Sequence, residues 1–308
     1  MTQERDVGDA IGAQSLRAIF AMLAGGALLT LNDALIKSLA QTYPVGEVMF
    51  IRAAFVMPWI FLLARRDGGL HMLRINSVRG QALRSACVIC SSFLFINGLT
   101  FLPLADAIAI SFTGPLFITA MAPLVLGETV GWRRWLSVLA GFAGVLLMLR
   151  PGNGTLQWAV LLPLGAALFG GTRDLITRRI SQTESTVAVL FVTTCVVMLA
   201  GLATAAFGWP AFRPQDLWTF ALSGLLIAGA HYLMIEAFRL GEAALVAPFK
   251  YTSMVWAVLF GFLVFGELPD VWTLAGAGVV ILSGLYILHR ETRFRRRPVT
   301  AIGPSARL

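Results

Sequence analysis

Residues 123 to 149 read PLVLGETVGWRRWLSVLAGFAGVLLML, and residues 262 to 288 read FLVFGELPDVWTLAGAGVVILSGLYIL. The two stretches share a motif, because Gly127-Glu128 in the first corresponds to Gly266-Glu267 in the second at an offset of 139 residues. An internal match at a fixed spacing indicates duplicated structural units. The chain therefore consists of two related halves.

A second match extends the repeat to the other ends of the two halves. LNDALIK at residues 31–37 corresponds to TRDLITR at residues 172–178, which places Asp33 opposite Asp174 at an offset of 141. Charged residues are thus repeated inside two stretches that are otherwise apolar. The repetition indicates a shared role for them.

The composition places the chain in a membrane. Of its 308 residues, 57% are hydrophobic and 13% are charged, and the mean hydropathy is +0.79. A soluble domain carries about 25% charged residues. The first fifteen residues lack the cationic start of a signal peptide, so we expect no cleavage. The expected location is the cell membrane, which is the inner membrane in a bacterium.

Apolar runs of about 20 residues predict helices that cross a bilayer. Short breaks with turn chemistry, such as RPGNGT and GELPD, separate them. The predicted fold is an all-α integral membrane protein with ten transmembrane helices. These spans lie near residues 16–40, 45–64, 81–101, 104–126, 131–149, 156–177, 185–207, 217–238, 243–265 and 270–289.

The arginines predict how these helices are oriented, because cytoplasmic loops collect Lys and Arg. With the N-terminus inside, eighteen arginines fall in inner segments and two, Arg150 and Arg213, fall outside. Both termini are therefore predicted to be cytoplasmic, as an N-terminal segment at 1–15 and a basic tail at 290–308. That tail is interpreted as an anchor on anionic lipid, not as a nucleic-acid site.

Five helices per half make the two repeats inverted, since an odd number of crossings reverses the second half. The repeats span residues 16–149 and 156–289. GETVGWRR carries two arginines where this topology needs a cytoplasmic loop, and GELPDVW carries only acids where it needs an external one. Inverted repeats are an architecture of secondary transporters, whose substrate sites lie near the membrane midplane.

These features resemble the drug/metabolite transporter superfamily, specifically its ten-helix members built from two EamA-type repeats. The resemblance covers residues 16–289 and is most specific in LPLADAIAISFTGPLFITAMAPLVLGETVGWRRW and LGEAALVAPFKYTSMVWAVLFGFLVFGELPDVW. It implies export or exchange of small metabolites driven by gradients. Among subfamilies the chain looks most like the YddG-type exporters of aromatic and other neutral amino acids.

Several other function classes lack their motifs. There is no G-x-x-x-x-G-K-[ST] phosphate loop, so we expect no nucleotide as partner. The histidines form no ligand cluster, and Cys87-x-x-Cys90 has no second pair nearby, so we expect no metal and no cofactor. We also expect no enzymatic activity and no nucleic-acid binding. The expected partners are a small-molecule substrate and the lipid bilayer.

Ionisable groups within spans need a partner or a purpose, because each costs at least about 2.5 to 3.5 kcal/mol at the bilayer centre. Asp33 and Lys37 are one helical turn apart and can pair along one face, with Asn32 beside them. Arg52 in the second span can reach outward or pair with Glu47. An ion pair between Asp33 and Lys37 is one interpretation of the charges in the first span. A role in gating or in substrate contact is the other.

Arg173 and Asp174 occupy the repeat-equivalent place in the sixth span. Equivalent positions of inverted repeats fall on opposite sides of the midplane. We therefore hypothesise that Asp33 and Lys37 belong to an external gate, and that Arg173 and Asp174 belong to a cytoplasmic one.

The fourth and ninth spans carry prolines at near-equivalent places, Pro115 and Pro248, which fit broken helices that expose backbone groups. The alternative is that both only kink packed helices. Polar side chains surround each proline. They are Ser111 and Thr113 in the fourth span, and Lys250, Tyr251, Thr252 and Trp256 in the ninth.

The eighth span adds His231, Tyr232 and Glu236, and Asn97 is the equivalent of Glu236 in the third span. His231 is a hydrogen-bonded helix residue, an aromatic contact or a titrating group. Glu236 is interpreted as snorkelling or contacting a gate. Lys250 is a candidate anchor for an anionic group, and a single lysine suits a carboxylate better than a phosphate-rich ligand.

Taken with the resemblance to the EamA-type transporters, the sequence predicts a secondary-active or facilitative exporter of small neutral or aromatic amino acids or related metabolites that works by alternating access. The near alternative is a transporter of other small metabolites, such as sugar phosphates, nucleotide sugars, amines or drugs. A more distant alternative is a membrane protein that has no transport activity.

Overall fold

The computed structural model describes residues 2–66, 68–126, 131–149, 158–180, 184–240 and 247–295. The burial of side chains is described only for residues from 16 onward. The motif at Gly127-Glu128 and the tail from residue 296 lie outside the described residues. The α-helices are α1 (Thr2–Ala40), α2 (Val45–Arg66), α3 (Val78–Phe101), α4 (Leu104–Ser111), α5 (Gly114–Leu126), α6 (Trp132–Leu149), α7 (Leu161–Ile180), α8 (Thr186–Ala203), α9 (Leu217–Leu240), α11 (Ser253–Phe265) and α12 (Val271–Arg295). Short 3-10 helices are η1 (Leu70–Leu73), η2 (Thr204–Phe207), η3 (Pro214–Asp216) and η4 (Ala247–Thr252).

Every regular element in the described ranges is a helix, which confirms the all-α prediction. Among these residues, six helical stretches are long and apolar enough to cross a membrane, and three shorter ones are apolar. The first helix extends back to Thr2, so the predicted N-terminal segment continues α1 as helix.

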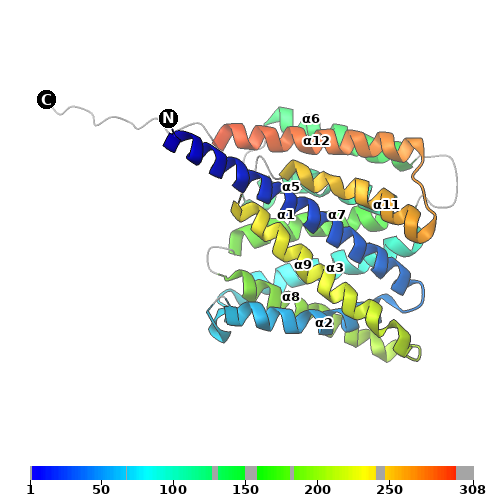
Figure 1. The fold of residues 1–308 in the computed structure, drawn as a ribbon. Coiled ribbons are helices and arrows are strands. Elements are labelled where there is room, and N and C mark those ends of the chain that lie inside the picture. The colour runs from blue at the N-terminus through cyan, green and yellow to red at the C-terminus, as the bar shows by residue number, and fades with distance from the viewer. Residues whose placement is uncertain are drawn as a thin grey trace.

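The helices pack in pairs that are exchanged by a two-fold relation between the halves. In that relation α1 corresponds to α7, α3 to α9, and the α4–α5 span to the η4–α11 span. The contact of α1 with α9 then matches that of α7 with α3, and α1 with α11 matches α7 with α5. The pairs α2 with α8 and α6 with α12 map onto themselves (Figure 1). The two-repeat membrane fold accounts for this whole pattern.

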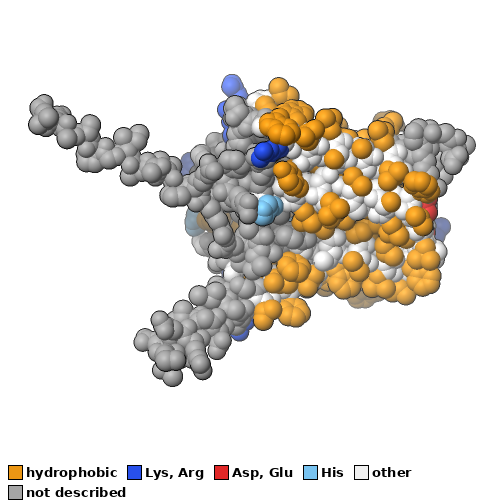
Figure 2. Space-filling view, turned by 90° about the horizontal axis from the view of Figure 1, so that it is seen from above, with side chains coloured by type: hydrophobic (Ala, Val, Ile, Leu, Met, Phe, Trp, Pro, Cys, Tyr) orange, Lys and Arg blue, Asp and Glu red, His pale blue; other side chains and the backbone are white. Residues whose placement is uncertain are grey.

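Two ends of the bundle need names. The start of α1 and the end of α12 lie at the same end (Figure 1). We call this the inner end, since the arginine distribution predicts that it faces the cytoplasm, and we call the opposite end the outer end. Figure 2 shows hydrophobic side chains spread over the face of α6 and α12, with Lys and Arg gathered toward the inner end. This is the surface expected of a protein in a bilayer.

The fourth and ninth spans are interrupted near the middle of the bundle. α4 ends at Ser111 and α5 begins at Gly114, with a turn at Phe112 and Thr113. In the ninth span the 3-10 helix η4 precedes α11. The two interruptions meet, because the rings of Phe112 and Tyr251 pack edge to face with centroids 5.2 Å apart. A side chain added at Gly114 would meet no described atom within 4 Å.

The outer end holds most of the largest apolar core. Its buried residues come mainly from the last turns of α1 and α3, the first turns of α2, and α4. At each end, hydrogen bonds also connect the two halves of the chain. At the outer end Tyr43 donates to Asp216 at 2.6 Å. At the inner end Glu184 accepts hydrogen bonds from the backbone N–H groups of Asn76, at 2.7 Å, and of Ser77.

The close contact of α6 and α12 generates a prediction about stability. A Cβ at Gly276 would lie 2.5 Å from the carbonyl oxygen of Gly144, whereas one at Gly278 would meet nothing within 4 Å. We expect Gly276→Ala to lower the unfolding free energy by about 1–3 kcal/mol through overpacking. Gly278→Ala, the matched control, should leave it unchanged or raise it, since Ala favours helix. Thermal unfolding in detergent measures both, and equal effects would contradict the packing described.

Candidate functional site

A buried ion pair joins three distant segments at the outer end. The Lys37 ammonium of α1 lies 2.6 Å from both carboxylate oxygens of Glu267 and donates to the Leu102 carbonyl at 2.9 Å. The backbone N–H of Leu104 donates to the same carboxylate at 3.1 Å. Lys37 is only 2% exposed. The pair therefore fixes α1 against the α3–α4 connection and the α11–α12 loop.

The chain turns sharply to bring Glu267 to this position. Gly266 ends α11 in the left-handed region at φ 69°, and its N–H bonds to the Phe262 carbonyl at 2.9 Å. Glycine adopts this conformation without steric cost, which is why it terminates helices so often. The Gly-Glu motif is thus a helix stop followed at once by an ion-pair partner.

The predicted pairing of Asp33 with Lys37 was wrong. Lys37 instead points outward along α1 to Glu267, because two carboxylate oxygens and a backbone carbonyl satisfy its three donors there. Asp33 accepts from the Asn32 side chain at 3.2 Å, and its charge interacts with that of Arg52 on α2. Asn32, which is fully buried, accepts from Ser223 of α9 at 2.7 Å.

The suggested pairing of Arg52 with Glu47 was also wrong. Arg52 interacts electrostatically with Asp33, whereas the buried Oε2 atom of Glu47 has no hydrogen-bond partner among the described residues. Asp33 and Arg52 thus interact between α1 and α2, not with a residue one turn away on their own helix.

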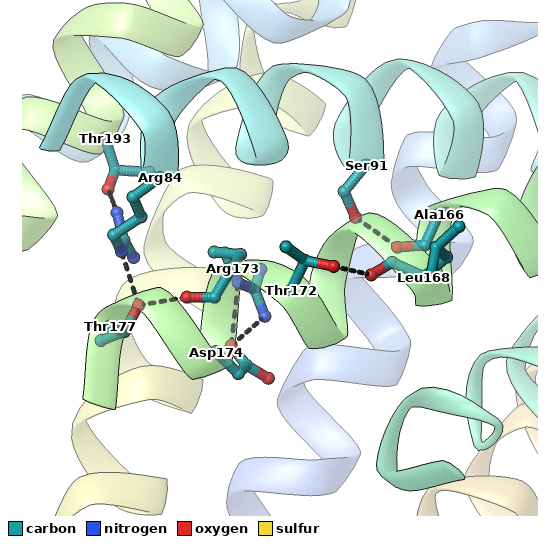
Figure 3. Close-up of polar contacts among 9 residues, drawn as sticks. All are labelled: Arg84, Ser91, Ala166, Leu168, Thr172, Arg173, Asp174, Thr177 and Thr193. Carbon is teal, nitrogen blue, oxygen red and sulfur yellow. Dashed lines mark hydrogen bonds and ion pairs between the residues drawn. The ribbon is translucent and has the colours of Figure 1, made fainter. Parts of the chain in front are cut away.

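The inner half holds a second charged group. Arg173 and Asp174 of α7 form an ion pair at 2.8 Å, in which the side chains are 35% and 49% exposed. Arg84 of α3 donates to Thr177 at 2.7 Å and to Thr193 of α8. Figure 3 shows Arg84 reaching these two hydroxyls beside the Arg173–Asp174 pair. Arg84 is one of the eighteen arginines assigned to inner segments from the sequence, but it is buried within α3.

Lys250 and His231 complete this network from the other side. Lys250 of η4 interacts electrostatically with Asp174 and Arg173, and His231 of α9 interacts with Arg173, Arg52 and Lys250. Both side chains are solvent-exposed even though protein atoms surround them densely. Because they face charges on other helices, their exposed surface lies between helices and not toward lipid.

The remaining predicted residues divide into two sets. Four polar side chains donate within their own spans, to carbonyls three or four residues earlier, and so serve local structure as well. They are Asn97, Ser111, Thr113 and Thr252. The other set makes contacts of a different kind or is only partly buried: Tyr232 is exposed with Arg66 over its ring, Glu236 is half-buried on α9, and Tyr251 packs on Phe112.

Trp256 differs from these residues because its polar group is buried without a partner in the part of the chain that the structure describes. Its indole N–H is buried and has no hydrogen-bond partner among the described residues. Such a donor calls for a ligand or water. Pro115 lies in the first turn of α5 and Pro248 in η4, next to the two helix interruptions.

Sequence reasoning missed three residues that the structure brings to these groups: Glu267, Arg84 and Ser223. Glu267 had a signal, because an acid directly after a span was repeated at Glu128. Arg84 and Ser223 had none, since an arginine near a helix end and a serine in an apolar helix are common. Within the described ranges, no three His, Cys, Asp or Glu side chains are placed to hold a metal ion.

Paired charges buried between helices of two inverted repeats are the elements of a carrier that opens to one side at a time. The model of the EamA-like transporter family matches the chain twice, at residues 16–150 and 157–289. The chain belongs to this family. It is accordingly a multi-pass membrane transporter of small metabolites.

The chain is 32% identical over 286 residues to a riboflavin transporter of Rhizobium johnstonii, covering 91% of this chain and 93% of the relative. It is 28% identical to an S-adenosylmethionine uptake transporter of Rickettsia felis, covering 86% and 90%. It is also 28% identical to the pseudopaline exporter CntI of Pseudomonas aeruginosa, covering 89% and 96%. A solved crystal structure that is 19% identical shares the fold with a TM-score of 0.62, over 91% of this chain and 99% of that one.

The outer ion pair generates a prediction. Removing one partner of a buried pair leaves the other charge uncompensated, which costs about 3–5 kcal/mol. We therefore expect Lys37→Met or Glu267→Gln alone to destabilise the protein by about this amount, and the double variant to lose clearly less than the sum. SDS titration of the purified variants in mixed micelles measures the unfolding free energies. Strict additivity would show that the two side chains do not act as a pair.

Proposed function

We propose that this transporter carries a neutral or anionic small organic metabolite with a planar ring. The network of charges in the inner half carries this proposal. Among the described side chains it contains three cations, Arg84, Arg173 and Lys250, around the carboxylate of Asp174. Arg52 and Asp33 interact with each other nearer the outer end. An excess of positive charge in a medium of low dielectric constant repels a cationic ligand and favours an anionic or electron-rich one.

The chemistry of the named relatives sharpens this choice. S-adenosylmethionine has a net positive charge at neutral pH, so the network disfavours it. Riboflavin is an uncharged heteroaromatic compound, and pseudopaline carries carboxylates. The rings of Phe112, Tyr251 and Trp256 around the two helix interruptions suit a planar ligand. Together with the relatives' names, these contacts favour a flavin-like metabolite over the aromatic amino acid that the sequence predicted.

The contrast between the two ends supports a mechanism of alternating access. At the outer end the Lys37–Glu267 pair and a continuous apolar core close the space between the repeats. In the inner half Asp174, His231 and Lys250 are exposed. We infer that the structure represents an inward-facing state. In this state the outer gate consists of Lys37 and Glu267, in place of the hypothesised Lys37 and Asp33.

Counterflow in proteoliposomes tests the proposed substrate class. Vesicles preloaded with riboflavin, phenylalanine, a carboxylate-rich opine or S-adenosylmethionine take up the same radiolabelled compound, with and without a pH gradient. We expect uptake of riboflavin or of an anionic compound, and no uptake of S-adenosylmethionine above protein-free vesicles. Preferred uptake of S-adenosylmethionine would overturn the charge argument, and flux of no compound in the panel would overturn the proposed class.

Lys250 supplies a prediction about specificity. Lys250→Glu reverses one charge next to Asp174, so we expect transport of the accepted neutral or anionic substrate to fall about tenfold or more, and Lys250→Met to give a smaller loss. Arg74→Gln is the matched control, because Arg74 is exposed in the connection between η1 and α3. Initial rates at equal protein content are the measurement. Parent-like rates in both Lys250 variants would remove this residue from the substrate path.

The outer gate supplies a separate prediction. In a background without the three native cysteines, Ser111→Cys places a thiol at the interruption of the fourth span. We expect little labelling by a membrane-impermeant maleimide added outside, and a several-fold increase when Glu267→Gln is added, since the gate then opens more often. Asp216→Asn weakens the neighbouring hydrogen bond with Tyr43, and it serves as the control for a general loss of stability at the outer end. Equal labelling in the Glu267→Gln and parent backgrounds would refute the gate.

A further inference from the structure

A groove on the membrane-facing side of the protein lies far from the charged network. It runs between α6 and α12 and has a volume of about 450 Å³. Trp132, Arg133 and Tyr286 line its inner end, and Leu136 and Leu282 line the part nearer the middle of the bilayer. The candidate substrate site uses none of these residues.

Helix geometry explains why the groove exists. The two helices pack closely at Gly144 and Gly276, since a Cβ at Gly276 would lie 2.5 Å from the carbonyl oxygen of Gly144. Toward the inner end the small residues Ser137, Ala140 and Ser283 line the groove between larger side chains. With a rise of about 1.5 Å per residue, Arg133 lies roughly 16 Å along α6 from Gly144. The groove is therefore the space that these small side chains leave between two packed helices.

The lining changes from polar to apolar along its length. At the inner end the exposed Arg133 guanidinium lies over the Trp132 ring, 5.3 Å from its centroid. Ser137 donates to the Arg133 carbonyl at 3.1 Å, so its hydroxyl bonds within its own helix. Farther along, Leu136 is 54% exposed and Leu282 is 68% exposed. A cation, then aromatic rings, then aliphatic side chains match an anionic headgroup, the glycerol region and an acyl chain in that order.

We propose that this groove binds an anionic phospholipid of the cytoplasmic leaflet, with its phosphate at Arg133 and one acyl chain along Leu136 and Leu282. The groove lies on the membrane-facing surface, where it is in contact with lipid. The positive charge of Arg133 favours a lipid with a negatively charged headgroup. Basic pockets between transmembrane helices on the cytoplasmic side bind such lipids in general. The site is independent of the transported substrate.

Native mass spectrometry of the full-length protein tests the site. Dioleoyl-phosphatidylglycerol and dioleoyl-phosphatidylcholine are titrated separately into protein in a neutral detergent. We expect tighter binding of phosphatidylglycerol to the parent, a loss of about tenfold in Arg133→Gln, and an effect under twofold for phosphatidylcholine. Ala140→Phe, which fills the groove, should weaken both lipids. Arg79→Gln, the control at the inner end of α3, should bind as the parent does.

Several outcomes would overturn the proposal. Equal losses in Arg133→Gln and Arg79→Gln would show general surface attraction, and unchanged binding in Ala140→Phe would place the lipid elsewhere. Full competition by glycerol 1-phosphate would show that an anion suffices without an acyl chain. If Ala140→Phe converts a dimer to a monomer without changing lipid binding, the groove is instead an interface between copies.

A second measurement on the unaltered protein does not depend on how the variants fold. Phosphatidylglycerol with a photoreactive group in its acyl chain is cross-linked in nanodiscs, and the labelled peptides are identified. We expect labels on α6 and α12 around Leu136 and Leu282, in excess over other lipid-facing helices. Labelling spread evenly over the membrane face would contradict a specific site.

Discussion

The ion pair between Lys37 and Glu267 is the contact on which the closed outer end depends. It brings an ammonium group, a carboxylate and two backbone groups from three separate segments to one point. In a low dielectric each of these groups is costly alone and acceptable together. The surrounding core of α1, α2, α3 and α4 packs around this contact, which supports the proposal that the outer end is closed in this state.

The inner half follows a different rule. Among its described side chains, Arg84, Arg173 and Lys250 surround the carboxylate of Asp174, and several members remain exposed. Such a group gains from a ligand that brings negative charge or hydrogen-bond acceptors. The two halves of the membrane thus use ionisable residues in opposite ways. At the outer end, oppositely charged side chains pair and hold segments together. At the inner end, the excess of positive charge around Asp174 favours a negatively charged or electron-rich ligand.

The sequence predicted the helices, their order and the two-fold repeat, because hydropathy, turn residues and arginine distribution each report on the bilayer directly. It did not predict side-chain partners. Asp33 and Lys37 are well spaced to pair within a helix, yet each found a partner on another segment, since tertiary contacts supply more donors and acceptors than one helical face can. The role of Glu267 was visible only as a repeated motif, and Ser223 left no pattern because its contact with Asn32 depends on how α1 and α9 are placed.

The turn at Phe112 and Thr113 leads into Gly114, which faces open space in the middle of the bundle. Its backbone is not in the left-handed region, so other residues can adopt the same conformation. A larger side chain at this point would narrow the space without compressing the core. The backbone here thus tolerates side chains of different size without a change in the surrounding helices.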